Sequence, residues 1–326
     1  MAIIKPFICV RPEEQIADQV AALPYDVYDR KEAYAAVAGS PLSFLNIDRP
    51  DTQFPPDVDM YADCVYEKAR ELLERWIEEG IFVTEKKKCL YVYQLVMKGR
   101  SQTGIVACSS IDDYRNGVVR RHENTREDKQ IDRIRHVDAC DAQTGPIFLA
   151  YRARDEINWL VELVMKNGDR IYHFTTDDGV GHRVWRIDDE KMIQNFVDAF
   201  SRVPYTYIAD GHHRAESAVR VGELRRKQHP GYTGEEPFNY FLSVLFPGDQ
   251  LMIMPYNRVV QDLNGLTEEA FLAAASEHFR VSPAADPVKP ERKGVVGLYL
   301  PGRWYRMEAK EEILSDDPVA GLDVSI

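Results

Sequence analysis

The sequence predicts a mixed α/β (α+β) fold, in which helices flank a central mixed sheet built from hairpins. Residues 89–97 and 103–111 alternate their side chains between two faces on either side of the turn at 98–100, which is typical of a β-hairpin. Residues 61–80 carry apolar side chains at three-to-four spacing, which is typical of a helix that buries one face. A strand, a turn and a helix follow one another at 204–222.

The other elements follow in chain order from the same patterns. The proline-rich segments 49–58 and 283–290 are predicted to be a surface loop and a linker. Apolar or alternating runs predict strands at 3–10, 43–48, 117–121, 145–151, 171–175, 183–187, 205–209, 238–246, 251–256, 295–300 and 304–308. Helical spacing and end signals predict helices at 30–38, from about residue 126, and at 155–165, 189–200, 212–222 and 267–278.

We expect three parts along the sequence, because 326 residues are enough for two or three packed units. Residues 1–84 form an N-terminal α/β portion, and residues 85–230 form a core that contains the motif described next. Residues 231–326 form a C-terminal α+β portion. These boundaries follow shifts in the pattern of predicted elements.

Composition narrows the classes of partner and the compartment. The net charge of −12 argues against a nucleic-acid partner, because proteins that hold a phosphate backbone usually present a basic face. The five cysteines are odd in number and form no Cys-x-x-Cys pair, which favours reduced thiols in a cytoplasm. Residues 1–10 lack the pattern of a signal peptide, and no apolar run is long enough to span a bilayer. We therefore expect a cytoplasmic protein that does not contact a membrane.

The segment Asp210-Gly211-His212-His213-Arg214 follows a predicted strand and opens a predicted helix. Free N–H groups and the helix dipole favour an anion at such a position, so two imidazoles and a guanidinium there indicate a phosphate or carboxylate site. Asp210 offers a hard oxygen ligand that suits Mg²⁺, whereas the spacing of the histidines does not indicate zinc. The alternative is that Asp210 is only a helix cap and that the next three residues are a solvated helix start.

A second segment, Arg121-His122-Glu123, lies between a predicted strand and a predicted helix whose capping box is Thr125 to Asp128. A carboxylate among several cations suits a base beside an anionic substrate. The alternative is a solvated helix in which acidic residues at helix spacing pair with the cations. The surrounding basic residues are Arg120, Arg121, Arg126, Lys129, Arg133 and Arg135.

Over essentially its whole length the chain resembles a bacterial family catalogued as domain of unknown function 1015. Members of that family continue beyond the position of Ile326, so the resemblance implies that a C-terminal portion is missing. The stretches that carry it are Leu23-Pro-Tyr-Asp-Val27, Asn46-Ile-Asp48, Ser101-Gln-Thr-Gly104, Arg121-His-Glu-Asn-Thr125, Thr144-Gly-Pro-Ile-Phe148 and Ala209-Asp-Gly-His-His-Arg214.

The Asp-Gly-His-His-Arg motif after a strand also looks like the signature of the ParB/sulfiredoxin superfamily. This resemblance implies a ParB/sulfiredoxin-like core in residues 85–230, with N- and C-terminal extensions and with nucleotide phosphates held at the helix start. One branch of the superfamily, the free-serine kinases, phosphorylates L-serine with ADP or ATP and magnesium. Some eighty residues separate the two segments here, more than in compact members, so the role of Glu123 stays open. The resemblance implies Glu123, His122 and Asp210 as catalytic residues, Asp210 also as the metal ligand, and Gly211, His212, His213, Arg214 and Arg121 as ligands of the nucleotide.

We therefore expect a magnesium-dependent phosphotransferase that moves a phosphoryl group from ADP or ATP to a small hydroxyl acceptor such as free L-serine. Its partners would be a nucleotide and a small molecule, and a homo-oligomer stays open. The alternative is a non-catalytic, ParB-like nucleotide-binding regulator. A hydrolase or redox enzyme is the third class, and sulfiredoxin-like chemistry would need a cysteine that residues 210–214 lack.

Overall fold

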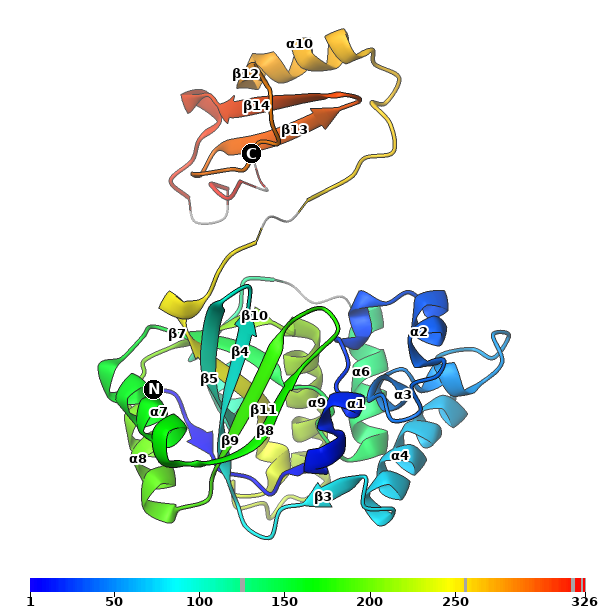
Figure 1. Ribbon diagram of the computed structural model, residues 1–326, viewed down its shortest axis with the longest axis vertical. Coiled ribbons are helices and arrows are strands. Elements are labelled where there is room, and N and C mark those ends of the chain that lie inside the picture. The colour runs from blue at the N-terminus through cyan, green and yellow to red at the C-terminus, as the bar shows by residue number, and fades with distance from the viewer. Residues whose placement is uncertain (124–126, 255–256, 318–319, 324, 326) are drawn as a thin grey trace. The chain divides into compact units, whose positions relative to one another are not determined.

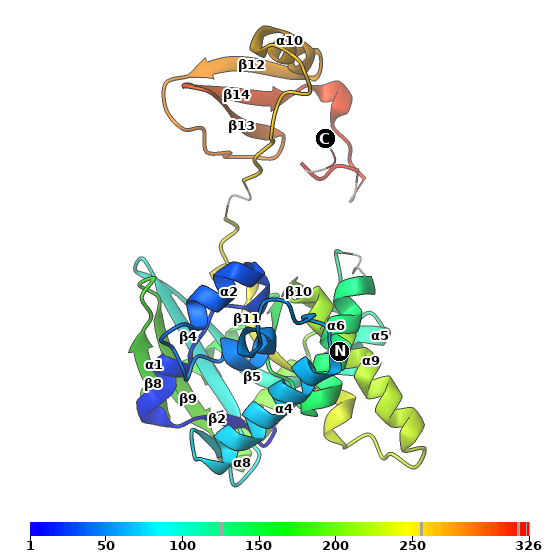
Figure 2. The ribbon, with the colours of Figure 1, turned by 90° about the vertical axis from the view of Figure 1, so that its right-hand side faces the viewer.

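The structure is a computed structural model that describes residues 1–123, 127–254, 257–317, 320–323 and 325 (Figures 1 and 2). The chain divides into two compact units, Met1–Leu251 and Met252–Ile326. The first unit contains the predicted segments 1–84 and 85–230, and the second contains most of the predicted segment 231–326.

A mixed sheet forms the centre of the first unit, as the sequence predicts. Its strands lie in the order β6-β10-β7-β11-β5-β4-β9-β8, and β1 pairs with β5 beside this row. Strand β10 is parallel to β6, and β11 is parallel to β7, whereas the other pairs are antiparallel. The strands are β1 (Ile4–Lys5), β4 (Leu90–Met97), β5 (Arg100–Ser110), β6 (Val119–Arg120), β7 (Ile147–Tyr151), β8 (Asp169–Thr175), β9 (Gly181–Ile187), β10 (Thr206–Asp210) and β11 (Tyr240–Pro247).

Helices cover both faces of this sheet (Figure 1). Helices α7 (Asp155–Asn167) and α8 (Glu190–Phe200) lie on one side, and α9 (His212–Gln228) lies on the other. Helix α6 (Glu127–Cys140) packs on α9, and α4 (Asp63–Glu78) packs on α6. The confirmed hairpins 90–110 and 169–187 and the helices therefore build the predicted mixed α/β class.

Helix α9 approaches the rest of the fold through small side chains, as its sequence predicts. Ala215, Ala218 and Val219 are buried in the main core. A Cβ atom added at Gly222 would lie 2.3 Å from the carbonyl oxygen of Phe238 and 2.8 Å from a methyl group of Ile111. Glycine at 222 therefore allows a close approach that positions the whole helix.

The N-terminal helices pack on α4 around a second core of Val20, Ile47, Leu72, Trp76 and Phe82. The elements of this region are β2 (Val10–Pro12), which pairs with β3 (Phe82–Thr84), and the α-helices α1 (Ala17–Val20), α2 (Arg30–Val37) and α3 (Leu45–Asp48). The short 3-10 helices here are η1 (Glu14–Ile16), η2 (Tyr25–Val27) and η3 (Pro50–Gln53). The remaining short helices of this unit are α5 (Ile111–Arg115), η4 (Pro237–Asn239) and η5 (Gly248–Gln250).

Two predictions for this region are wrong. The segment 43–48 forms no strand and contains helix α3, because the Asn46 amide donates to the carbonyl of Ser43 at 2.8 Å and to that of Ser40 at 3.2 Å, closing a tight turn. The predicted surface loop at 49–58 begins with buried residues, since Asp51 is 3% exposed. Arg49 compensates for this burial by donating to both carboxylate oxygens of Asp51, at 3.0 and 3.2 Å.

Strand boundaries also differ from prediction at three places. The predicted strand 3–10 breaks into β1 and β2, because Pro6 has no N–H to donate to a ladder. Residues 251–254 form no strand, and Arg100 donates to the carbonyls of Gln250 and Leu251 instead. The predicted linker begins later than expected, because Pro283 belongs to β12 (Phe279–Ala284). The predicted capping box at Thr125 lies outside the described residues.

The second unit is a small α+β structure. Strand β14 (Arg303–Ala309) lies between β12 and β13 (Val295–Leu300) in an antiparallel sheet, and η6 (Glu311–Ile313) follows. Helix α10 (Glu268–His278) begins after Thr267, whose hydroxyl accepts from the N–H of Ala270 at 3.2 Å. Among the described helices of the whole chain, none is both long and apolar enough to cross a membrane. All five cysteines are free thiols.

Candidate functional site

The turn between β10 and α9 is built around Gly211. Its φ angle of +93° lies in the left-handed region, which glycine adopts without strain. Gly211 is the N-cap of α9, so no side chain caps the helix. The first turn of α9 also contains no acidic residue. The alternative interpretation, in which Asp210 is only the cap, is wrong. The N–H groups of the first turn are left for another partner.

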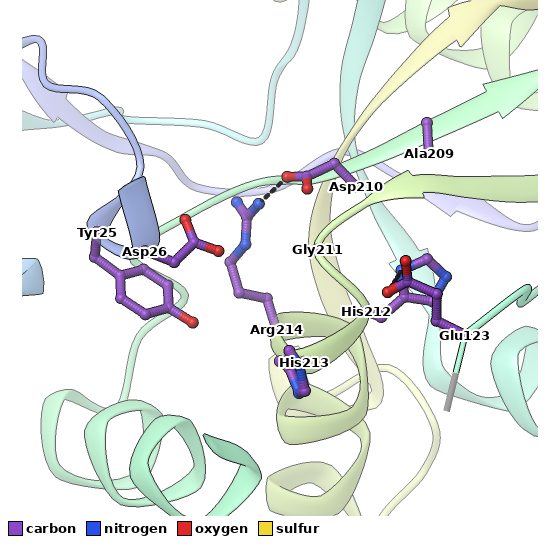
Figure 3. Close-up of a pocket in the computed structure, with 9 residues that line it drawn as sticks. All are labelled: Tyr25, Asp26, Glu123, Ala209, Asp210, Gly211, His212, His213 and Arg214. Carbon is purple, nitrogen blue, oxygen red and sulfur yellow. Dashed lines mark hydrogen bonds and ion pairs between the residues drawn. The ribbon is translucent and has the colours of Figure 1, made fainter. Parts of the chain in front are cut away.

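The helix start opens into a cavity of about 150 Å³ (Figure 3). The cavity brings Glu123 together with the motif, although the two segments are far apart in the sequence. Strands β6 and β10 run parallel, with Val119 paired to Thr206 and Arg120 to Tyr207, so both chains leave the sheet at the same edge. The lining residues are Tyr25, Asp26, Glu123, Ala209, Asp210, Gly211, His212, His213 and Arg214.

His212 is the most enclosed imidazole of the cavity, with 5% of its surface exposed. Its ring packs edge-on against that of His122, with 4.4 Å between the ring centroids, and its Nδ1 lies 3.7 Å from a carboxylate oxygen of Glu123. Burial lowers the pKa of His212, and the neighbouring imidazole of His122 lowers it further. His212 is therefore neutral near pH 7 and packs beside the more exposed carboxylate of Glu123.

Two buried imidazole nitrogens of the motif have no hydrogen-bond partner within the described residues. They are Nε2 of His212 and Nδ1 of His213. Leaving a buried polar nitrogen unpaired costs free energy, and nearly all such groups in folded proteins have a partner. Both nitrogens belong to residues that line the cavity.

Arg214 ties the helix start to the neighbouring strand. Its Nη1 donates to the carbonyl of Pro146 at 2.6 Å, just before β7, and its Nη2 donates to the carboxylate of Asp210. Figure 3 shows the guanidinium between the carboxylates of Asp210 and Asp26. Arg214 therefore supplies positive charge to the cavity while two of its N–H groups hold the local structure.

Arg121 does not line this cavity. Its guanidinium lies 5.0 Å from the ring centroid of Tyr114, and its Nη1 lies 3.8 Å from a carboxylate oxygen of Glu216. His122 is not a lining residue either, and it contributes through its contact with His212. The structure thus brings six of the eight residues expected for the site into the cavity wall.

Sequence reasoning about chemistry missed Tyr25 and Asp26, which approach from η2. Burial raises the pKa of Tyr25 to about 12, although the guanidinium of Arg133, 4.0 Å from the ring centroid, opposes this shift. Tyr25 therefore keeps its phenolic proton at neutral pH. The only signal in the sequence was the Leu-Pro-Tyr-Asp-Val stretch, which carried the family resemblance but no chemical pattern.

A buried polar network supports the wall of the cavity from behind. Thr144 donates to the carboxylate of Asp48 at 2.7 Å, which joins the loop before β7 to α3. His136 of α6 is 1% exposed, and its Nε2 lies 2.8 Å from the carbonyl oxygen of Ile47. Since Arg133 of the same helix stacks on Tyr25, α6 connects η2, α3 and the cavity. Four of the stretches that carry the family resemblance therefore lie around one site. The hydrogen bond from Thr144 to Asp48 joins a fifth stretch, the one that ends at Asp48, to this site.

The carboxylates of Asp26, Glu123 and Asp210 line the cavity. Within the part of the chain that the structure describes, no group of three or more His, Cys, Asp or Glu side chains is arranged to hold a metal ion. Magnesium is usually held by one or two carboxylates together with phosphate oxygens of a substrate. The cavity therefore offers carboxylates to a magnesium ion that binds together with a phosphate, and among the described residues it forms no cage made by the protein alone.

Comparison with known proteins identifies a family. The model of the family described as "Protein of unknown function (DUF1015)" matches residues 4–325. No curated protein and no solved structure matches the chain. The chain belongs to the DUF1015 family.

Proposed function

We propose that this DUF1015 protein is a magnesium-dependent phosphotransferase, which moves a phosphoryl group from ADP or ATP to a small hydroxyl acceptor such as free L-serine. One observation carries the proposal. An uncapped helix N-terminus, two imidazoles that each have an unpaired buried nitrogen, and the carboxylate of Glu123 line one cavity. These groups suit phosphoryl transfer, because its catalysis consists mainly of positioning and of stabilising charge. We further propose that residues 85–230 contain a ParB/sulfiredoxin-like core, which rests on the motif resemblance.

In this proposal the helix start holds the transferred phosphoryl group. The N–H groups of the first turn of α9 and the side chain of His213 donate to its oxygens, and Arg214 adds positive charge beside them. Magnesium, held by Asp210 and by the phosphates, would neutralise part of the developing negative charge. The size of the cavity, about 150 Å³, admits a phosphoryl group and a hydroxyl group but not a whole nucleotide.

Glu123 is the general base for the acceptor hydroxyl in this proposal. Its side chain is 63% exposed, so an acceptor can reach it from solvent. His212 lies against the carboxylate and, with His122, limits the positions that it can take. A base within hydrogen-bond reach of the hydroxyl typically accelerates proton transfer by about 10²- to 10⁴-fold.

Thermal denaturation with nucleotides tests the binding step. A ligand that binds only the folded state raises its stability, so ADP or ATP with Mg²⁺ is expected to raise Tm. The His213→Ala variant should lose this shift, whereas Lys227→Gln, at the exposed far end of α9, should keep it. No shift with ADP, ATP, CTP or GTP, with or without Mg²⁺, would remove the proposal.

Transfer itself is tested by incubating the protein with L-serine, Mg²⁺ and ADP or ATP and detecting O-phosphoserine by ³¹P NMR. A non-catalytic nucleotide-binding regulator is the second candidate, and the exposure of Glu123 and the lack of a described three-ligand metal group favour it. Nucleotide binding that depends on His213, without phosphate transfer to serine or another small alcohol, would select this second candidate.

A further inference from the structure

A second cavity, of about 310 Å³, lies along α9 beyond the first. The segment 121–123 and helix α9 each contribute to both cavities. Glu123 and His212 line the first cavity, whereas Arg121 and Glu216 line the second. His122, which contacts His212, lies between Arg121 and Glu123 in the sequence and lines neither cavity. The residues that line the second cavity are Tyr114, Arg115, Arg121, Glu216, Val219, Arg220 and Glu223.

Glu216 anchors the wall of this second cavity. It is 9% exposed, and its two oxygens accept from the hydroxyl of Tyr114 at 2.6 Å and from Nε of Arg220 at 2.8 Å. Burial alone would raise the pKa of Glu216, but these hydrogen bonds outweigh burial and hold the pKa below its usual value. The carboxylate is therefore charged and already paired, so it holds arginines in place and does not attract a cationic ligand.

In the part of the chain that the structure describes, each arginine of the second cavity contacts its neighbours through only one nitrogen of its guanidinium group. Arg115 places Nη1 3.0 Å from Glu223, and Arg121 places Nη1 against Tyr114 and Glu216. Arg220 uses Nε. Within the described residues, Nη2 of each of the three makes no hydrogen bond, and the three side chains are 54%, 55% and 56% exposed. Three guanidinium groups that line the cavity thus have N–H donors without a described partner, and contacts with Glu223, Tyr114 and Glu216 restrict their positions.

We propose that this second cavity binds a phosphate group, either free or carried by a larger ligand. Three guanidinium groups against two carboxylates give the lining a net positive charge. Guanidinium donors match phosphate oxygens in pairs, and fixing the side chains beforehand reduces the entropy lost on binding. A group with three oxygens and two negative charges uses three such donors better than a carboxylate does. This site stands beyond the proposed transfer reaction and does not depend on it.

Isothermal titration calorimetry on the full chain with inorganic pyrophosphate tests the proposal. The His213→Ala background removes a donor of the first cavity, so the remaining binding reports on the second. We expect this binding to weaken at least about tenfold when Arg220→Gln is added, because a charged hydrogen-bond donor is lost. Adding Lys227→Gln, which removes a charge from the exposed end of the same helix, should change it less than about twofold.

A second variant guards against a purely structural effect. Arg220→Gln also removes a hydrogen bond to Glu216, so Arg115→Gln, which leaves Glu216 fully paired, should weaken pyrophosphate binding as well. Equal pyrophosphate affinity in His213→Ala with and without either arginine substitution overturns the proposal, and so does the absence of any binding. Succinate binding as tight as pyrophosphate also overturns the choice of phosphate.

Titrations with two further ligands, ADP and adenosine, identify the source of the phosphate. Binding of ADP that depends on Arg220, without binding of adenosine, assigns the second cavity to phosphates of a nucleotide. Binding of pyrophosphate that depends on Arg220, with no such dependence for ADP, assigns it to a free phosphate. If His213→Ala leaves nucleotide binding intact while Arg220→Gln abolishes pyrophosphate binding, the proposed function fails and the second site stands.

Discussion

The carboxylate of Glu123 lies 3.7 Å from Nδ1 of His212, although the two residues follow different strands of the sheet. Parallel pairing of β6 and β10 produces this contact, because it brings the ends of both strands to one edge. The distance depends on the register that pairs Val119 with Thr206, so the sheet itself positions the base that we propose beside the helix start.

Glu123→Gln is expected to lower the rate of phosphate transfer to L-serine by at least about 100-fold, because the amide cannot accept the hydroxyl proton. Nucleotide binding and Tm should stay close to those of the unchanged protein, because the side chain is 63% exposed. The matched control is Glu79→Gln, an exposed carboxylate at the end of α4. Turnover that survives in Glu123→Gln at the control rate would contradict the assignment of the base.

Gly211→Ala is expected to destabilise the protein more than Gly39→Ala does. Both glycines have positive φ angles, +93° and +81°, so alanine costs about 1–2 kcal/mol of backbone strain at either position. Only at Gly211 would the new Cβ lie 3.1 Å from the guanidinium of Arg214, whereas nothing lies within 4 Å at Gly39. Urea denaturation should show an extra loss of about 1 kcal/mol at Gly211, because a hydrogen bond of Arg214 is displaced.

A double substitution identifies the source of this extra loss. In an Arg214→Ala background, Gly211→Ala should cost no more than Gly39→Ala, because the guanidinium that the Cβ would meet is gone. An extra cost that persists in this background would show that the strain at Gly211 does not come from Arg214.

Gly222→Ala tests the close approach of α9 to the rest of the fold. Alanine gains about 1 kcal/mol in helix propensity over glycine, but overpacking in a filled core costs about 1–3 kcal/mol. The added Cβ would lie 2.3 Å from a backbone oxygen of Phe238, which cannot rotate away, so we expect net destabilisation. Gly231→Ala is the control, because nothing lies within 4 Å of its Cβ position. A rise in Tm for Gly222→Ala would contradict the packing.

Local patterns were enough to predict the hairpins, α9 and its small-residue face, because neighbours in the sequence determine them. Strand 43–48 was predicted wrongly because a short apolar run does not distinguish a buried strand from a helical turn. The hydrogen bonds of Asn46 decide this case, and they depend on the path of the preceding residues.

The residues of the candidate site were likewise predicted where local patterns determine them and missed where packing does. The strand–turn–helix pattern predicted that Asp210, Gly211 and His212 lie at a helix start. Tyr25 reaches the cavity because Arg133 of α6 stacks on it, and no pattern around residue 25 contains this contact. Arg121 was expected in the same cavity, but its contacts with Tyr114 and Glu216 place it in the wall of the second cavity. These contacts depend on the packing of α5 on α9, which no local sequence pattern predicts.

The stability of the first unit is expected to fall as the pH drops from about 7 to 5. Burial lowers the pKa of His136, His182 and His212 below the usual value of 6.5. The unfolded chain therefore binds more protons than the folded protein in this range, and stability rises with pH wherever the unfolded state binds more protons. The lowered pKa values of Glu216 and Asp112 act only below their usual values of 4.5 and 3.8, whereas burial raises the pKa of Asp113 above 3.8, which opposes the effect of the three histidines.

His136 should contribute most to this pH dependence, because it is 1% exposed and lies near the cation of Arg133. Asp48 and Asp132 oppose the shift without reversing it. Urea denaturation of His136→Gln between pH 5 and 7 should show a smaller slope of unfolding free energy against pH, even though the variant is less stable throughout. Substitution of His278, which belongs to the second unit, is the control and should leave the slope for the first unit unchanged. An unchanged slope in His136→Gln would mean that His136 is protonated equally in the folded and unfolded states.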